Sequence, residues 1–131
     1  MAANTNPIFS LTPGIAQAQV STANANRDGT GTLATVIAGS TNGRRVHRIT
    51  IKATVTTTAG MVRLFLDDGA NVRLFAEVIV TAITVGASTK GFESVLTYTG
   101  ETPLVLPSGV TLKASTHNAE AINVIAEYSD Y

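Results

Sequence analysis

Two histidines are the first residues of this sequence to consider for chemistry, because histidine titrates near neutral pH and is a common metal ligand. His47 lies in a segment of alternating polarity, and His117 follows a later one. They share no spacing typical of metal ligands, and the chain has no cysteine to complete a zinc site or act as a nucleophile. We expect both to be hydrogen-bonded core or rim residues. An enzyme would need them to converge with a carboxylate, and we predict no enzyme and no catalytic, cofactor-binding or metal-binding residues.

A group of carboxylates is the second candidate. Asp67 and Asp68 are adjacent, Gly69 follows them, and Glu77 is expected on the other strand of the same hairpin. Paired carboxylates serve as general acids and bases or bind calcium. An Asp-Asp-Gly sequence is also typical of a tight turn, in which the aspartates accept hydrogen bonds from the local backbone. We predict turn formation for this pair.

One segment imitates the start of a calcium-binding loop, with Asn24, Asn26 and Asp28 at alternate positions before Gly29. The twelfth position of such a loop is Thr35, where a bidentate glutamate is required, and no flanking helices are expected. The Gly-Thr-Gly sequence at 29–31 lacks the third glycine of a dinucleotide fingerprint. The segment therefore predicts neither a calcium site nor a phosphate site.

The charge balance argues against nucleic acid as a partner. Nine basic and nine acidic residues give a net charge of zero, whereas nucleic-acid binders carry a basic excess. The local basic cluster, Arg44, Arg45, His47 and Arg48, has no aromatic residues between its members for base stacking. We expect it to contact an acidic partner or to form a solvated rim.

The ends and apolar runs of the sequence give no sign of targeting. Residues 1–10 lack the basic start and apolar run of a signal peptide, and no stretch approaches the ~20 apolar residues of a membrane helix. We expect a soluble, unprocessed chain with no membrane partner.

The composition predicts strands. Hydrophobic residues make up 44% of the chain but aromatic residues only 5%, so the apolar content is mostly aliphatic, and threonine is abundant. Branched residues of this kind suit a pleated surface. Residues 46–55 alternate, and the predicted apolar face carries His47, Ile49, Ile51, Ala53 and Val55. The other expected strands are 33–37, 61–67, 72–80, 92–98, 104–106, 110–115 and 121–128.

Seven or eight short strands separated by Gly and Pro predict an all-β fold, an antiparallel β-sandwich. A jelly roll is the commonest arrangement of eight such strands and is the expected one; an immunoglobulin-like sandwich is the alternative. Residues 1–32 are polar without clear periodicity, so we expect an extended N-terminal arm over 1–32 and a single β-sandwich domain over 33–131.

The hairpin at Asp68-Gly69 is expected to have one apolar face and one mixed face. Aromatic, Met and Arg side chains are enriched in protein interfaces. The mixed face is therefore a predicted interface, unless a loop, the arm or a second sheet covers it. It carries Met61, Arg63, Phe65, Arg73, Phe75, Glu77 and Ile79.

Several short segments resemble small structural proteins of tailed-phage virions. They are the opening 4–9, the stretch 21–32, the segment 103–112 and the close 114–120. The resemblance implies a head decoration or cement protein with a jelly-roll fold, located on the capsid surface of the virion and assembled in the host cytoplasm. It also implies two partners: copies of the chain itself, as a dimer or trimer, and the major capsid protein.

On this hypothesis the arm and the mixed hairpin face bind across joints between coat subunits. The predicted interface residues are Phe9, Met61, Phe65, Phe75 and Ile79, with Arg44, Arg45 and Arg48 at the rim. The alternative is a tail-associated, fibre-associated or carbohydrate-binding β-sandwich, in which Tyr98, Tyr128 and Tyr131 are the candidates for stacking on sugars.

Overall fold

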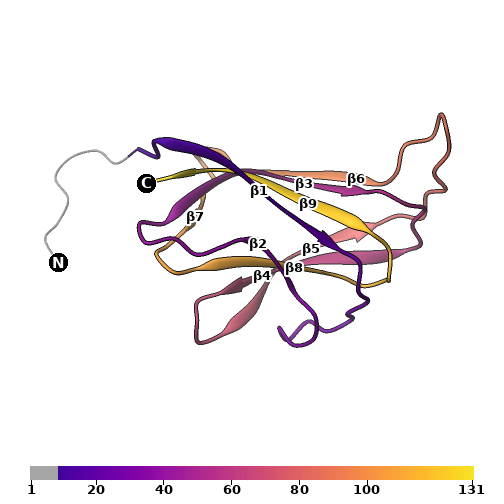
Figure 1. Ribbon diagram of the computed structural model, residues 1–131, viewed down its shortest axis with the longest axis horizontal. Coiled ribbons are helices and arrows are strands. Elements are labelled where there is room, and N and C mark those ends of the chain that lie inside the picture. The colour runs from indigo at the N-terminus through magenta and orange to yellow at the C-terminus, as the bar shows by residue number, and fades with distance from the viewer. Residues whose placement is uncertain (1–8) are drawn as a thin grey trace, which may run out of the picture.

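A computed structural model describes residues 9–131, and in this part of the chain nine β-strands form two facing sheets without an α-helix (Figure 1). Accordingly, no helix of residues 9–131 is long and apolar enough to cross a membrane. The strands are β1 (Thr12–Val20), β2 (Ala34–Ile37), β3 (Arg44–Ala53), β4 (Gly60–Asp67), β5 (Val72–Val80), β6 (Glu93–Thr97), β7 (Leu104–Leu106), β8 (Thr111–Thr116) and β9 (Ile122–Asp130).

The strand order is that of a jelly roll. One sheet has the order β1-β9-β3-β6, with the short β7 also paired to β3, and the other has the order β2-β8-β4-β5. All named strand pairs are antiparallel. Apart from β7, the chain passes between the two sheets at every connection except the β4–β5 hairpin, and its first and last strands lie side by side. The predicted all-β sandwich of jelly-roll type is confirmed, and the immunoglobulin-like alternative is not.

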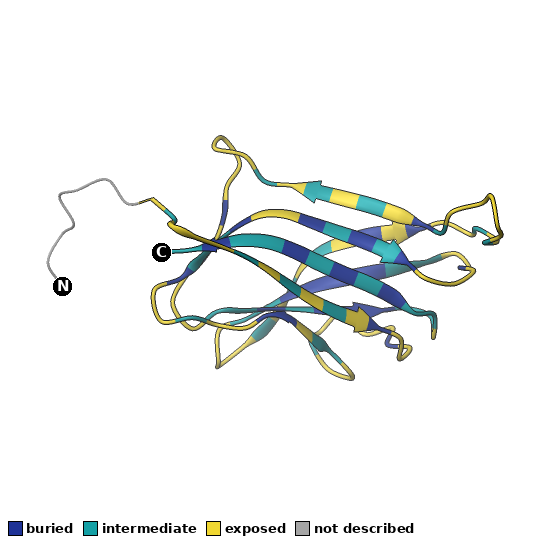
Figure 2. Ribbon diagram, turned by 45° about the horizontal axis from the view of Figure 1, so that its top comes forward, coloured by how far each residue is buried: buried dark blue, intermediate teal, exposed yellow. Residues whose placement is uncertain are grey.

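The core lies between the sheets and consists of the alternate, inward-facing residues of each strand (Figure 2). Ile49 and Ile51 of β3 face Leu64 of β4 and Leu112 of β8, and all four are fully buried. Burial of each such side chain stabilises the fold by about 1.5–3 kcal/mol. The core is largely aliphatic, and Phe92 contributes a buried ring to it.

The strand β1 corrects the predicted arm. Residues 12–20 were placed in the arm over 1–32, but the structure pairs each of them with β9, from Thr12 opposite Asp130 to Val20 opposite Ile122. The inward side chains include Ala16 and Ala18, which are too small to give a strong hydrophobic alternation. Residues 1–8 of the predicted arm lie outside the described residues.

An irregularity in β3 moves His47 out of the core. The register of β3 against β9 shifts between Val46 and Arg48, so that one extra residue is accommodated. Val46 and Ile49 both face the core as a result, and His47 is exposed. The prediction that His47 lies on the apolar face of a regular strand is therefore wrong.

Candidate interaction surfaces

The outer face of β4 is covered by the connection between β1 and β2, residues 21–33, which crosses it below the sheet in Figure 1. Ala23 forms a parallel bridge with Thr116 of β8, and an added side chain at Gly29 would touch Val72 of β5. Phe65 is fully buried although it lies outside the sandwich core. Phe65 was predicted as an interface residue, and its burial within its own chain makes that prediction wrong.

A buried arginine ties this connection to the sheet. Arg63 is only 2% exposed, and its Nε donates a hydrogen bond to Glu77 Oε2 at 3.1 Å. One of its terminal nitrogens lies 3.4 Å from the Asn24 carbonyl oxygen and 3.4 Å from His117 Nδ1. Arg27 of the connection donates to the same Glu77 oxygen at 2.8 Å. The hydrogen bond from Arg27, with a further contribution from Arg63, lowers the pKa of Glu77.

The asparagines that imitate a calcium loop organise the connection itself. Asn24 is buried, and its amide nitrogen donates to the carbonyl oxygens of Thr30 and Thr32, each at 3.0 Å. The Asn24 amide oxygen accepts the backbone N–H of Asn26 at 3.0 Å. Because these polar atoms are used inside the loop, they are not free to bind a cation. No group of three or more candidate metal ligands occurs among residues 9–131.

The remaining predicted contacts on the hairpin do not form one surface. The register of β5 against β4 skips Phe75, whose ring packs against Tyr98 of the other sheet with 6.5 Å between centroids. Met61 is partly buried, and its sulfur lies 3.8 Å from the Arg27 guanidinium. Ile79 is 69% exposed. Of the apolar side chains predicted on this face, Ile79 alone is largely available to a partner.

Two arginines of the basic cluster pair with carboxylates of the same chain. Arg44 Nε donates to Asp130 Oδ1 at 2.7 Å, and the Arg44 guanidinium lies 4.7 Å from the centre of the Tyr128 ring. Arg48 forms an ion pair with Glu127 on the neighbouring strand. Arg45 is partly buried, and within residues 9–131 it forms no ion pair. Two of the three arginines of the cluster therefore have their charge compensated by a carboxylate of the same chain.

An open groove lies on the outer face of the first sheet and crosses β9, between β1 and β3. Its volume is about 650 Å³. His47 points into it and forms a 2.7 Å hydrogen bond with Ser129, which confirms the expected hydrogen-bonded rim histidine. The full lining is Pro13, Gly14, Ile15, His47, Arg48, Glu127 and Tyr128.

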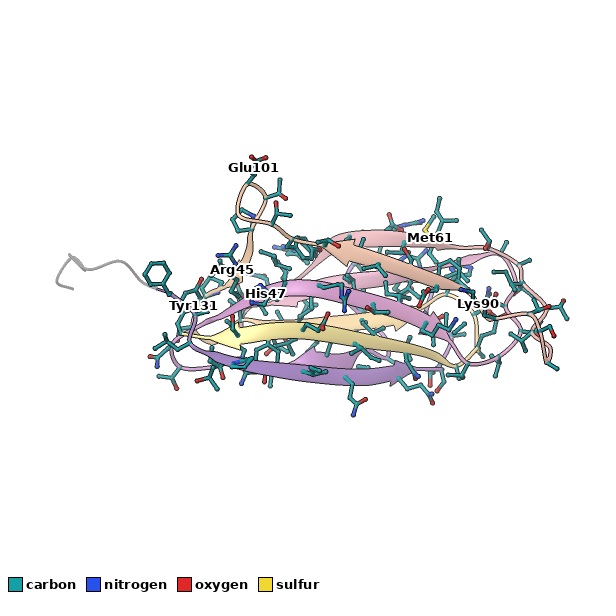
Figure 3. The ribbon with its side chains drawn as sticks, turned by 90° about the horizontal axis from the view of Figure 1, so that it is seen from above. Arg45, His47, Met61, Lys90, Glu101 and Tyr131 are labelled. Atoms are coloured by element: carbon teal, nitrogen blue, oxygen red, sulfur yellow. The ribbon has the colours of Figure 1, made fainter. Side chains whose placement is uncertain are left out.

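The two histidines do not converge. The backbone N–H of His117 donates to the Met61 carbonyl at 2.8 Å, and Figure 3 shows Met61 and His47 well apart along the sandwich. The two histidines are therefore not placed to act together as acid and base.

The paired carboxylates form a turn, as predicted. Asp68 Oδ1 accepts the backbone N–H groups of Ala70 and Asn71, and Asp67 Oδ1 accepts that of Gly69 at 2.8 Å. Asp67 also pairs with Lys113 at 2.8 Å, and this contact is the main cause of its lowered pKa. Both aspartates thus stabilise the turn between β4 and β5.

The largest exposed apolar side chains gather where the chain enters β1. Phe9 is 72% exposed, Leu11 is 80% exposed and Ile15 is 69% exposed. They are separated by two and four residues, which places them on one side of an extended chain. The backbone N–H of Leu11 donates to the carbonyl oxygen of Asp130, so the pairing with the last strand continues before the start of β1. We call Phe9, Leu11 and Ile15 the N-terminal apolar row. Sequence analysis identified Phe9 but missed the other two, although their alternation was visible.

Known proteins offer the following comparisons. No protein-family model matches the sequence, and neither does any curated protein. Two crystal structures of a pentameric capsid protein from metagenomic phage sequences each align with 88% of this chain at 14% identity, with TM-scores of 0.46. The chain spans only 62% and 60% of those two chains. The capsid asymmetric unit of cyanophage Pam1 aligns with 100% of this chain and 94% of its own, at 18% identity and a TM-score of 0.48. At these scores the likeness carries no conclusion about function.

Proposed function

We propose that this chain is a structural subunit of a tailed-phage virion that decorates or cements the capsid by binding across joints between coat subunits. The observation that supports this proposal is the N-terminal apolar row, in which three large side chains are exposed on one side of an extended segment. Apolar groups grouped in this way on a folded surface mark sites of protein contact. The sequence segments that resemble tailed-phage proteins give the proposal its context.

The position of the row suits a subunit that bridges neighbours. The row lies at one end of a rigid sandwich, where the chain leads toward its N-terminus (Figure 1). Contacts made there and on the sandwich body act together, because one bound site raises the effective concentration at the next. A protein that binds only the assembled shell stabilises that shell by mass action.

Three of the predicted interface residues fit this role. Phe9 belongs to the row, Ile79 is exposed on β5, and Arg48 lies in the groove beside β1. We propose these as contacts with the major capsid protein, in a virion on whose surface the chain also meets copies of itself. Phe65 is fully buried and the Arg44 side chain is 20% exposed against 52% for Arg48, so neither Phe65 nor Arg44 is among the proposed contacts.

The carbohydrate-binding alternative receives no comparable support. Tyr98 packs against Phe75, and burial raises the pKa of the Tyr98 hydroxyl. The Tyr128 ring lies between Arg44 and Gly14. Both rings therefore pack against neighbours within the chain, although Tyr128 also lines the open groove.

The test is the copy number of this protein in purified particles of the phage that encodes it, measured by quantitative mass spectrometry. Hundreds of copies per particle are expected for a protein that repeats over a capsid. A few to a few dozen copies would move the protein to the tail or a fibre, and its absence from particles would overturn the proposal.

A rebinding assay locates the contact. Purified protein is added to particles that lack it, and the variant Phe9→Ser/Leu11→Ser is expected to lose binding. The matched control is Val105→Ser, which removes an exposed apolar side chain from β7. Equal binding by all three proteins would exclude the N-terminal apolar row as the contact.

A further inference from the structure

The two sheets have four edges, and three of them carry features that hinder pairing with another chain. The strand β2 has only 4 residues and an irregular register with β8. The edge strand β5 carries Arg73 and Glu77 and has a register shift at Phe75. The edge opposite β1 consists of β6 and β7, which have 5 and 3 residues. Short strands, charges and bulges are the usual protections of an edge.

The fourth edge, β1, lacks these protections. It has 9 residues, its register with β9 is regular throughout, and its single proline is the second residue. No residue from Met1 to Asn26 is charged; the first charged residue is Arg27. Seen from above, β1 forms the free border of its sheet (Figure 3).

The outer edge of β1 has no hydrogen-bonded strand neighbour among the described residues, in which β9 is its only strand partner. An edge strand directs alternate N–H and C=O groups away from its partner. The side chains do not block approach, since Gly14, Ala16 and Ala18 are small and Gln17 and Gln19 are uncharged. The edge from Gly14 to Val20 is therefore open to a further antiparallel strand.

We propose that β1 pairs with β1 of a second copy of this chain, antiparallel and about a two-fold axis, which joins two four-strand paths into one continuous sheet. Full overlap of Thr12–Val20 with itself places the axis at Ala16, so that Ile15 of each copy lies opposite Gln17 of the other. A two-fold contact requires a surface that is complementary to itself. An uncharged strand meets this condition, because no like charges come together.

A second copy fits this edge better than a charged partner would. An acidic or basic strand would bury its charges against β1 without an opposite charge in Thr12–Val20 to pair with them. The net charge of the chain is zero, so two copies approach without long-range repulsion. The inference builds on the self-association included in the proposed function and selects the dimer over the trimer.

The first test is the mass of the purified full chain in solution, measured by sedimentation equilibrium over a range of concentrations. Wild type is expected to dimerise. Ile15→Lys/Gln17→Lys places lysines opposite one another twice across the axis, and it is expected to weaken the dimer by at least about tenfold. Ile79→Lys is the matched control, because Ile79 lies on another edge strand and has the same exposure as Ile15, 69%.

The second test does not depend on the lysine variants. The chain has no cysteine, so Gln17→Cys introduces a single thiol. In the proposed pairing, the two Gln17 positions are diagonal neighbours, about 7–8 Å apart. A short bismaleimide is expected to cross-link Gln17→Cys into a covalent dimer, whereas Ile79→Cys, whose thiols lie away from the β1 edge, is expected to dimerise without being cross-linked.

The outcomes separate this inference from the proposed function. A monomer at all concentrations, a trimer, or equal cross-linking of both cysteine variants would overturn the β1 pairing. None of these results bears on the copy number in particles. A confirmed dimer that is absent from particles would retain the pairing and overturn the virion role.

Discussion

Arg63 Nε lies 3.1 Å from Glu77 Oε2, and this contact joins a guanidinium that is 2% exposed to a carboxylate at the molecular surface. Glu77 also accepts a hydrogen bond from Arg27 of the covering connection. One carboxylate therefore holds the connection and the sheet together. The positive charge of Arg63 is tolerated below the connection because Glu77 and the Asn24 carbonyl compensate the loss of its hydration.

Arg63→Ala is expected to destabilise the protein by about 3 kcal/mol, because it leaves a cavity below the connection and removes the donor to Asn24. Arg63→Met keeps the volume of the side-chain stem and is expected to cost less than half as much. The free energy of unfolding from urea titrations measures both. Arg73→Ala on the exposed side of β5 is the control, and an equal loss in all three variants would contradict the role of Arg63.

Phe65→Ser is expected to destabilise the fold by about 3–5 kcal/mol, since it deletes a fully buried ring. Phe75→Ser is expected to cost less, because Phe75 is partly exposed and packs on one side against Tyr98. If both side chains lay at an interface, as the sequence predicts, both replacements would instead leave the fold unaffected. Thermal unfolding followed by circular dichroism measures the difference, and equal midpoints would contradict it.

Gly14→Ala is expected to destabilise the protein by about 1–3 kcal/mol. An added Cβ would lie 2.5 Å from Cζ of Tyr128, so the ring must move, and its contact with Arg44 is lost. Gly100→Ala is the control, because a Cβ there meets nothing within 4 Å. The free energy of unfolding in urea compares the two variants. A shift no larger for Gly14→Ala than for Gly100→Ala would show that Tyr128 is free to rotate away.

Acid is expected to weaken the β4–β5 hairpin. Lys113 lowers the pKa of Asp67 below its ordinary value of 3.8, so the ionised carboxylate favours the folded state. This stabilisation is complete above the ordinary value and is lost as the pH falls through and below it. Asp67→Asn should therefore flatten the dependence of the urea midpoint on pH between about pH 5 and pH 2.

The control for this experiment is Glu101→Gln, which changes an exposed carboxylate that takes part in no ion pair within residues 9–131. If Asp67→Asn keeps the slope of wild type, the ion pair with Lys113 does not contribute to acid stability.

Eight of the nine strands could be predicted from the sequence because their alternation and their turns agree. The segment 104–106 is bounded by prolines, and the Asp-Gly turn separates β4 from β5. The strand β1 was missed because Gly14, Ala16 and Ala18 provide the inward positions, and small residues give little hydrophobic contrast.

The candidate surfaces were harder to predict than the strands. A single extra residue at His47 and another at Phe75 change which side chains face outward, and an alternating pattern contains no mark of such a shift. The burial of Phe65 depends on a connection some forty residues earlier in the chain, so local sequence could not reveal it. Phe9 was accessible to prediction because it lies in a polar segment.

The pairing of β1 with β9 determines when the first sheet can form during synthesis of the chain. Val20 lies opposite Ile122 and Thr12 opposite Asp130, so β1 has no partner in its own sheet until the chain has been synthesised through β9. Contacts so distant in sequence slow folding, because the intervening chain must be ordered first. Until then the uncharged strand β1 lacks its partner, and other unfinished chains are expected to compete with β9 for it.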